Sequence, residues 1–481
     1  MKARLLNVAL DPENRKWWSL LAVSFGLFMI MLDNTVVNVA LPSIQKSLHV
    51  TQSELEWVVV GYALSFATFM LTGGKLADRY GRRLLFVVGL VIFTASSLAC
   101  GLAPSAHFLV GARVVQGVGA AIMNPATLSI ITATFPPRQR GMAIGIWAGV
   151  SAMALAIGPL VGGALTEYVH WSWIFFINVP VGVLGIAVTR WAVDESRDTS
   201  REQRLDVPGL VSSGVGLFAL TYALIEANNY GWTSARILAL FAVAIVALAV
   251  FVLLEQRQRL PMLDLSLFRS RTYAGANVAM LLITLAMFGI FFFNSLFFQN
   301  ILGYSPTQTG ALFLPMTVLI ILVAPQAGRL SDRIGSRWLI GCGLGMVTLS
   351  LILFAQLDQG SDFWNALPAL LVGGFGMALA MTPTTAAAMG SVPVDKAGVG
   401  SAVLNAFRQV GGSLGIAVMG AVVASQISVG PRNPAYADQF IDGYHLSLYV
   451  AAGIAFTGAA VAVAMVRKVR HVEVAEAASA A

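Results

Sequence analysis

Charged side chains are scarce in this sequence. Asp, Glu, Lys and Arg together make up 11% of its 481 residues, against about 25% in soluble domains. Hydrophobic residues make up 57%, and there are 46 Gly, a composition that suits closely packed helices in lipid. An ordinary soluble domain is therefore excluded. The net charge of +7 does not require a nucleic-acid partner, because Lys and Arg collect in the cytoplasmic loops of membrane proteins.

Cysteine is rare, and the common catalytic motifs are missing. The two Cys, Cys100 and Cys342, lie in apolar runs, and the five His are scattered. This pattern argues against a disulfide framework and against a metal site. There is no P-loop pattern, no nucleophile elbow and no H-E-x-x-H. We therefore expect no enzyme activity, no metal and no cofactor.

Long apolar stretches dominate what is present. A membrane-spanning helix needs roughly 20 mostly apolar residues, and we count fourteen such segments. The first is too long for a signal peptide and has no A-x-A cleavage site after it, so we expect it to remain as a helix. The sequence thus predicts an all-α membrane protein. The segments are 17–41, 56–74, 84–103, 106–130, 141–165, 173–192, 207–226, 236–254, 273–297, 308–328, 338–356, 365–389, 398–425 and 444–466.

The distribution of basic residues agrees with fourteen helices. With the N-terminus inside, only Lys46, Arg236 and Arg432 of the 30 Lys and Arg fall in outer loops. Arg113 and Arg408 fall within helices, and the others lie on the expected cytoplasmic side. Such a bias predicts that both termini are cytoplasmic.

Two similar loops indicate an internal repeat. GKLADRYGRR at 74–83 matches GRLSDRIGSR at 328–337 in the spacing of Gly, Asp and Arg, and MNP at 123–125 is echoed by MTP at 381–383. The repeat relates the first six helices to the last six and leaves two between them. We predict three parts: a six-helix bundle in 1–200, two inserted helices in 201–260, and a second six-helix bundle in 261–481. Such repeats are typical of secondary transporters with a site between the halves, although channels contain repeats too.

The matched loops are candidates for a cytoplasmic gate. Gly81 and Gly335 permit tight turns, and Asp78 and Asp332 can accept hydrogen bonds from Arg or from helix N-terminal amides. Contacts of this kind can form in one conformation and break in another. The alternative is a short basic turn without a gating role. The gating residues that we assign are Gly74, Asp78, Arg79, Gly81, Arg82, Gly328, Asp332, Arg333 and Gly335.

Asp33 and Arg113 are charged residues inside predicted helices. Each lies about seven or eight residues from the expected outer end of its helix, which places both roughly 10–12 Å below the outer surface. Equal depth permits an ion pair. A charge at mid-membrane costs about 2.5–3.5 kcal/mol, so it favours a functional role. We expect Asp33, the only acid that this division places well inside a helix, to bind the proton and Arg113 to tune it. The alternatives are a structural ion pair, or an Asp33 bonded to Asn34, Thr35 or Asn38.

Small residues mark the segment 141–165. Gly145, Gly158, Pro159, Gly162 and Gly163 would give it a smooth face and a point of bending. Ordinary close packing explains such a pattern as well as a sealing surface between the halves does.

Three other features have two interpretations each. Arg408, within a helix, is either a structural clamp or a coupling residue. Glu226, at the outer end of its helix, is an interfacial residue or attracts cations. The Phe-rich stretch 288–300 faces lipid, as is more common, or lines an apolar cavity.

These motifs resemble those of the major facilitator superfamily. GKLADRYGRR is similar to its loop signature, and 109–121 and 145–163 resemble its helix-4 and helix-5 antiporter signatures. Four further stretches are similar to signatures of its fourteen-helix drug:proton antiporter branch: LDNTVVNVALP (32–42), WSWIFFINVPVG (171–182), ILGYSP (301–306) and NAFRQVGGSLG (405–415).

The resemblance implies a 6+2+6 arrangement and alternating access. It implies proton-driven efflux of lipophilic, in particular cationic, drugs by a monomer in a bacterial inner (plasma) membrane, with the proton gradient in place of a cofactor. Asn34, Asn38 and Gln116 join Arg408 and Glu226 as candidates for substrate binding or coupling. The alternative is a dedicated exporter of one endogenous metabolite, antibiotic or lipid. A sensor is disfavoured because no loop can hold a readout domain.

Overall fold

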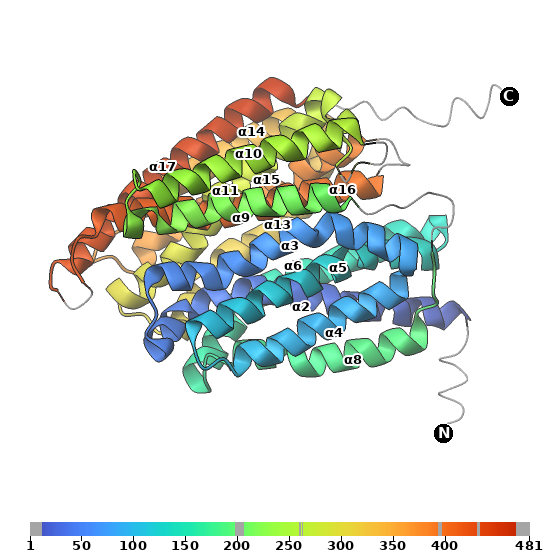
Figure 1. Cartoon of the computed structure of the whole chain (residues 1–481), viewed down its shortest axis with the longest axis horizontal. Helices are drawn as coiled ribbons and strands as arrows, with labels where there is room; N and C mark the ends of the chain where they lie inside the picture. The colour runs from blue at the N-terminus through green and yellow to red at the C-terminus, as the bar shows by residue number, and fades with distance from the viewer. Residues whose placement is uncertain are drawn as a thin grey trace.

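The computed structural model describes residues 12–197, 206–258, 261, 263–392, 397–430 and 433–467. Within these ranges every regular element is a helix and none is a strand. The helices run side by side along the long axis of the molecule (Figure 1). Helix α2 begins and helix α17 ends at the same end of the bundle, which we call the terminal end; the opposite end is the far end (Figure 1). The predicted all-α class is confirmed.

The first group of helices extends to Ala192, and its breaks follow from local chemistry. A capping box between Thr51 and Glu54 starts α3, and Gly81, with φ 125°, ends it. Pro180 lacks an N–H, and the predicted segment 173–192 is accordingly divided into α7 and α8. The elements are α2 (Pro12–Leu48), α3 (Gln52–Tyr80), α4 (Arg82–Gly101), α5 (Ala106–Thr134), α6 (Pro137–Tyr168), α7 (Trp173–Phe176) and α8 (Asn178–Ala192).

The second group begins after residue 263. The predicted segment 308–328 is divided at Phe313, next to Pro315 in the first turn of α13. The elements are η1 (Leu265–Arg269), α11 (Arg271–Leu296), η2 (Phe297–Ile301), α12 (Pro306–Leu312), α13 (Leu314–Ile334), α14 (Ser336–Phe354), α15 (Phe363–Gly390), α16 (Ala397–Gln426) and α17 (Tyr436–Met465).

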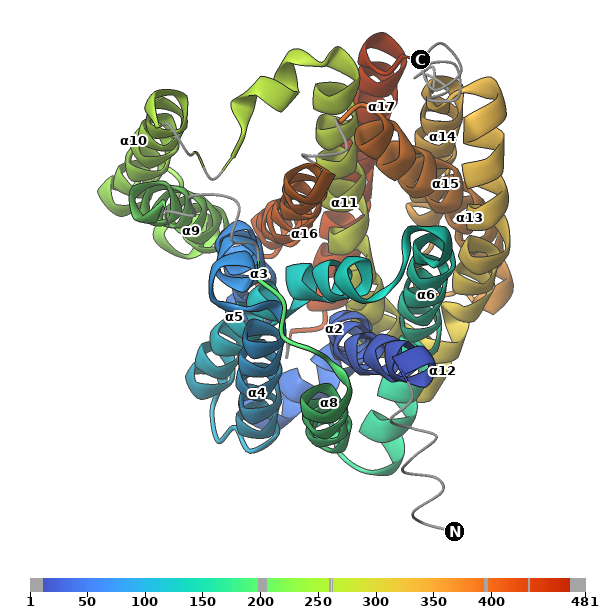
Figure 2. The same cartoon turned by 90° about the vertical axis from the view of Figure 1, so that its right-hand side faces the viewer.

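Two helices lie to one side of both groups (Figure 2). These are α9 (Val207–Tyr230) and α10 (Ala235–Arg257), which pack on each other. Trp57 of α3 packs on Phe218 and Tyr222 of α9, and α9 also contacts α16. Helix α9 therefore lies along the border between the two groups.

The two groups are joined at the far end. Gln299 Nε2 of η2 donates to the Val39 carbonyl of α2 at 2.8 Å, and Thr307 N of α12 donates to the Glu167 carboxylate of α6 at 2.9 Å. Helices α3 and α16 also pack together, as do α2 and α11. The described part of the molecule is thus closed at its far end.

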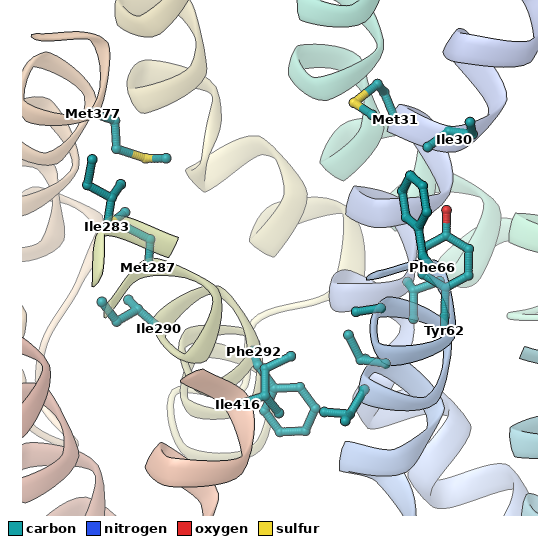
Figure 3. Packing of buried hydrophobic residues seen from close by; sticks show 14 of the residues in the cluster. Ile30, Met31, Tyr62, Phe66, Ile283, Met287, Ile290, Phe292, Met377 and Ile416 are labelled. Atoms are coloured by element: carbon teal, nitrogen blue, oxygen red, sulfur yellow. The ribbon is translucent and has the colours of Figure 1, made fainter. Parts of the chain in front are cut away.

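Buried apolar side chains of both groups belong to one core. Tyr62 and Phe66 of α3 and Phe292 of α11 are among them (Figure 3). Four rings of the Phe-rich stretch 288–300 are at most 1% exposed, so the expectation that this stretch faces lipid is wrong for them: Phe292, Phe293, Phe297 and Phe298. They are buried because α11 and η2 pack against neighbouring helices inside the second group and against α2.

Thirteen helices in the described residues are long and apolar enough to cross a membrane. The predicted segment 141–165 lies in α6, which is not one of the thirteen and has several side chains outside the described part. The many spanning helices are confirmed, while the count of fourteen stays a prediction.

Candidate functional site

Asp33 of α2 and Arg113 of α5 are in direct contact in the interior. Arg113 Nη1 donates to Asp33 Oδ2, and the two side chains are 1% and 0% exposed, respectively. Arg113 Nε donates to the Val58 carbonyl of α3 at 3.0 Å. The guanidinium also lies over the ring of Tyr62, 4.3 Å from its centroid. Arg113 is therefore held from three sides, by α2, by α3 and by an aromatic face.

A glycine one turn further along α5 brings this arrangement together. A Cβ added to Gly117 would overlap the Tyr62 carbonyl and the Ser65 hydroxyl of α3. Only glycine lets α5 and α3 approach so closely at this level, and that approach brings Arg113 within reach of the Val58 carbonyl.

Gln116 completes the network around the ion pair. Its Nε2 donates to Asp33 Oδ1 at 3.0 Å and to Ser97 Oγ at 2.8 Å, while its Oε1 accepts from Arg113 Nη1 at 2.7 Å. Gln116 is fully buried. Both carboxylate oxygens of Asp33 are thus occupied, and four helices of the first group contribute to one polar network: α2, α3, α4 and α5.

This network can respond to a proton. A proton on Asp33 would remove the negative charge that faces Arg113, while Arg113 would keep the Val58 carbonyl, Gln116 and the Tyr62 ring. A buried ion pair is sensitive to such a change, because an uncompensated charge in the interior is costly.

Asn34 and Asn38 lie beside Asp33 on α2 but outside its network. Asn34 Nδ2 donates to the Ile30 carbonyl at 2.9 Å, and Asn38 Nδ2 donates to the Asn34 carbonyl at 3.1 Å. Both side chains are half-buried. The alternative that Asp33 is bonded to these neighbours is therefore not what the structure shows.

Arg408 and Glu226 lie apart from Asp33. Arg408 is half-buried on α16, and within the described ranges no side chain forms a hydrogen bond or ion pair with it. Glu226 is half-buried on α9 and accepts from Asn229 Nδ2 at 2.8 Å. Asn229 also donates to Ser53 Oγ of α3 at 2.9 Å, so this cluster joins the inserted pair to the first group.

The first gating loop is tied to the end of α8. Arg82 Nε donates to Asp78 Oδ1 at 3.0 Å, while Gly81 provides the turn at φ 125°. Glu195, which the sequence reasoning did not select, accepts from the backbone N–H groups of Arg83 and Leu84, both at 3.1 Å. Its carboxylate caps the N-terminus of α4. The only sequence feature that indicates this role is the position of the acid, three residues after the predicted helix 173–192.

The other residues of this loop make simpler contacts. The Arg79 guanidinium lies over the Tyr80 ring, 5.2 Å from its centroid. Gly74 faces Pro125 of α5 at an ordinary packing distance.

The second gating loop keeps the turn but has different partners. Gly335 has φ 91°, and the hydroxyls of Ser331 and Ser336 are 2.7 Å apart across the turn. Arg333 is exposed, and Gly328 lies against Thr382 of α15. The side chain of Asp332 lies outside the described part. The repeat therefore preserves the backbone turn, and Ser336 stands at the position that Arg82 has in the first loop.

The small residues of α6 lie between the two groups. Gly158 would overlap Thr35 of α2 if it carried a Cβ, and at Gly162 a Cβ would lie 2.8 Å from Val36 Cα. Gly163 meets the backbone of Pro306 in α12. Pro159 is buried and its carbonyl lies against Gly310 of α12. Gly145 lies in the same helix, but its surroundings are outside the described part.

Asp33 is not the only acid buried within a helix, contrary to the expectation from sequence. Glu56, in the second turn of α3, is 3% exposed, and so is Glu255 near the end of α10. The position of a residue along its helix does not reveal that Glu56 and Glu255 are buried, because neighbouring helices exclude water from side chains even near helix ends. Leu263 N donates to Glu255 at 2.8 Å.

Comparison with known proteins places the chain among transporters. It is 40% identical over 411 residues, 85% of this chain and 76% of the relative, to the multidrug resistance protein Stp of Mycobacterium tuberculosis (strain CDC 1551 / Oshkosh). It is 37% identical to the tetracenomycin C resistance and export protein of Streptomyces glaucescens (86% and 77% covered). It is 35% identical to the puromycin resistance protein pur8 of Streptomyces alboniger (92% and 90% covered).

Solved structures show the same fold. The inward-facing, unoccupied structure of a bacterial homolog to the human lysosomal transporter Spinster has a TM-score of 0.67 at 18% identity, covering 94% of this chain and 97% of that one. The peptide-transporter-family protein PepTSo has a TM-score of 0.68 at 16% identity, with the same coverage. The family model described as the Major Facilitator Superfamily matches residues 23–416 and 276–480. The chain therefore belongs to the major facilitator superfamily and is a multi-pass transporter of the cell membrane, not an enzyme.

Proposed function

We propose that this transporter exports small lipophilic compounds, in particular cationic drugs, in exchange for protons. The observation that carries the proposal is the buried network of Asp33, Arg113 and Gln116, a titratable carboxylate paired with a cation inside the first group. Intramembrane ionisable residues of this kind mark proton relays.

The proposed topology has fourteen helices, a 6+2+6 division and a cytoplasmic terminal end. Its support is the distribution of Lys and Arg in the loops. With this orientation, the structure is closed toward the outside, where Glu167 meets Thr307. Alternating access then opens this far end and closes the terminal end, with the two gating loops at 74–83 and 328–337 making and breaking contacts there. The proposed transporter works as a monomer.

The coupling step is centred on Asp33. In the outward-open form Asp33 takes a proton, which neutralises the carboxylate that faces Arg113. In the inward-open form the proton leaves to the cytoplasm, and the restored ion pair accompanies binding of the next drug molecule. Arg113 acts as the group that stabilises the ionised carboxylate, because its positive charge faces Asp33. Its contacts to Gln116 and the Val58 carbonyl hold it in place. No cofactor takes part in this cycle.

Substrates are proposed to bind beside α15, in the second group. An open cavity of about 390 Å³ is lined by Met381, Thr382, Thr385, Ala386 and Met389 on the terminal half of α15, and ligand pockets usually span about 300–1,000 Å³. Methionine side chains adapt to ligands of different shapes. Asn34, Asn38, Arg408 and Glu226 remain candidates for substrate contacts or coupling.

A second candidate function is the export of one endogenous metabolite, antibiotic or lipid. Two relatives at 37% and 38% identity carry names that refer to a single compound, tetracenomycin C and methylenomycin A. A dedicated exporter would share the Asp33 network and differ only in the breadth of its substrate site.

Survival of a pump-deficient bacterial host distinguishes the two. Cells that express the protein are exposed to a panel of cationic dyes and antibiotics, with and without a protonophore. We expect protection against several unrelated compounds, lost when the protonophore collapses the proton gradient. Protection against one compound only favours the dedicated exporter. Protection that survives the protonophore contradicts proton coupling.

A further inference from the structure

A second carboxyl group is buried at the border between the two groups of helices. Glu56 of α3 is 3% exposed, at the far end, where α3 packs on both α16 and α9. Its carboxyl group lies against Gly420 of α16, and a Cβ at that position would overlap both carboxyl oxygens. The glycine thus leaves the space that the carboxyl group fills when α3 and α16 are in contact.

The nearest polar groups do not supply a positive charge. Glu56 Oε1 faces Gln52 Nε2 at 3.4 Å, a long hydrogen bond. Glu226, on α9, acts on Glu56 electrostatically with charge of the same sign. Glu54, on the same helix, is directed toward the Thr51 cap and lies 3.9 Å from the His107 ring.

The basic groups of the surrounding helices are distant from Glu56 or engaged elsewhere. Arg408 of α16 lies twelve residues before Gly420, about 18 Å along the helix. Arg113 of α5 is bound to Asp33. Arg236 of α10 donates to Tyr222 and lies over the Tyr230 ring, 4.0 Å from its centroid. Within the described ranges no cation forms an ion pair with Glu56, and on α16 its carboxyl group lies against Gly420.

Burying an ionised carboxylate without a cation is far more costly than burying a neutral carboxyl group. We propose that Glu56 is a second proton-binding site, distinct from Asp33, which must be protonated before α3 can close on α16 at the far end. When the two helices separate, water reaches the carboxyl group and the proton can leave.

This site has a different task from that of Asp33. Its role in transport rests on the proposed function and orientation, which place Glu56 toward the outside. There the proton would enter and leave on the same side, so Glu56 would not carry it across the membrane. Instead, external acidity would promote the return of the empty, outward-open transporter to the closed form. When Glu56 has no proton, the empty transporter would return to the closed form more slowly.

A distance measurement across the far end tests the proposal. Spin labels are placed on Leu102→Cys, between α4 and α5, and on Gly360→Cys, between α14 and α15, both exposed. The native Cys100 and Cys342 are first changed to Ser. The full-length protein is studied in lipid nanodiscs without substrate, in the Asp33→Asn background to remove the first site. We expect the ratio of open to closed molecules to rise with pH, by up to about tenfold per pH unit for one proton.

Glu56→Gln provides the decisive comparison, because the amide has the shape of the neutral acid. It should keep the far end closed at alkaline pH and abolish the pH dependence. Asp442→Asn, an exposed acid at the same end, is the matched control and should leave the dependence unchanged. Gly420→Ala should shift the protein toward the open form at every pH, and Glu56→Ala added to it should restore closure by removing the overlap.

A pH-independent ratio in the Asp33→Asn background, or the same dependence with Glu56 and with Glu56→Gln, would overturn the proposal. The substrate-free distance measurement does not involve drug transport. Failure of proton-coupled efflux would therefore be distinguishable from failure of this inference, since the first appears only in transport assays and the second only in these distances.

Discussion

The two halves of this transporter share a scaffold but differ in their buried chemistry. When the loops at 74–83 and 328–337 are aligned, Asp33 in the first half corresponds to Met287 in the second. When MNP at 123–125 is aligned with MTP at 381–383, Arg113 corresponds to Leu371. Met287 is 4% exposed and Leu371 is 38% exposed. The repeat thus duplicates turns and helix contacts, whereas the charged network occurs in one half.

This difference assigns separate tasks to the halves. The first half contains the carboxylate, the cation and the amide of the buried network. The second half also contains a buried neutral pair, in which the Tyr444 hydroxyl donates to Asn294 Oδ1 at 2.7 Å while its ring stacks on Phe297. A neutral pair does not respond to pH near neutrality. We infer that the second half supplies apolar surface and closure, and the first supplies the coupling.

The largest expected effect comes from removing the cation of the first half. Arg113→Ala leaves Asp33 buried without a cation, which costs about 3–5 kcal/mol, whereas Leu371→Ala removes a partly exposed side chain and should cost much less. Arg113→Lys should be intermediate, because an ammonium group cannot reproduce the planar contacts to Asp33 and Val58. Thermal unfolding in detergent measures the order.

Acidification is the control for this result. Lower pH should partly restore the stability of Arg113→Ala, because protonation of Asp33 removes the unpaired charge. Equal unfolding temperatures for Arg113→Ala and Leu371→Ala would contradict the assignment of the charged network to one half.

Glycine contacts offer a second, smaller comparison. Gly158 of α6 meets the end of the Thr35 side chain in α2, and Gly415 of α16 meets the backbone carbonyl of Leu285 in α11. A side chain can rotate away and a backbone cannot, so Gly415→Ala should lower stability and efflux more than Gly158→Ala. Both are compared by unfolding temperature and by dye efflux.

The double variant Gly158→Ala with Thr35→Ala should recover most of the loss at Gly158. If Gly158→Ala proves the more damaging of the two single variants, the proposed difference between the side-chain contact at Gly158 and the backbone contact at Gly415 is refuted.

The smallest expected difference concerns the gating turns. Gly81→Ala and Gly335→Ala both force a side chain into a positive-φ conformation, at a cost of roughly 1–3 kcal/mol. Gly81→Ala has the additional penalty of a Cβ 2.6 Å from the Glu195 carboxyl carbon. We therefore expect the lower unfolding temperature for Gly81→Ala. Combining it with Glu195→Ala should relieve the added penalty; a lower unfolding temperature for Gly335→Ala would refute this order.

The sequence predicted the helices well because each needs a long apolar stretch, and this requirement is visible residue by residue. It also predicted that Asp33 and Arg113 lie at the same depth in the membrane, and the contact between them agrees with this prediction. Gln116 was selected only through a family resemblance, and nothing in the sequence indicates that its amide joins both charges. The contact among these three side chains depends on the close packing at Gly117 and on the rotation of α5 about its axis. The order of residues in the sequence shows neither.

Glu56 and Glu195 show a second limit. Glu195 follows its helix and looks like a solvated loop residue, but it caps α4 from more than a hundred residues away in sequence. Glu56 lies near a helix start, where water is expected, and is buried only because α16 and α9 cover it. Such roles depend on long-range packing, so the three-dimensional arrangement had to reveal them.

Proton movement in proteoliposomes tests the central claim most directly. Purified protein is reconstituted, a gradient of a transported dye is imposed, and the internal pH is followed with a trapped indicator, for the unaltered protein and for Asp33→Asn. A cooperative unfolding transition and retained dye binding serve as the folding controls. The account predicts dye-driven proton movement for the unaltered protein and none above protein-free liposomes for Asp33→Asn. Undiminished proton movement in Asp33→Asn would contradict it.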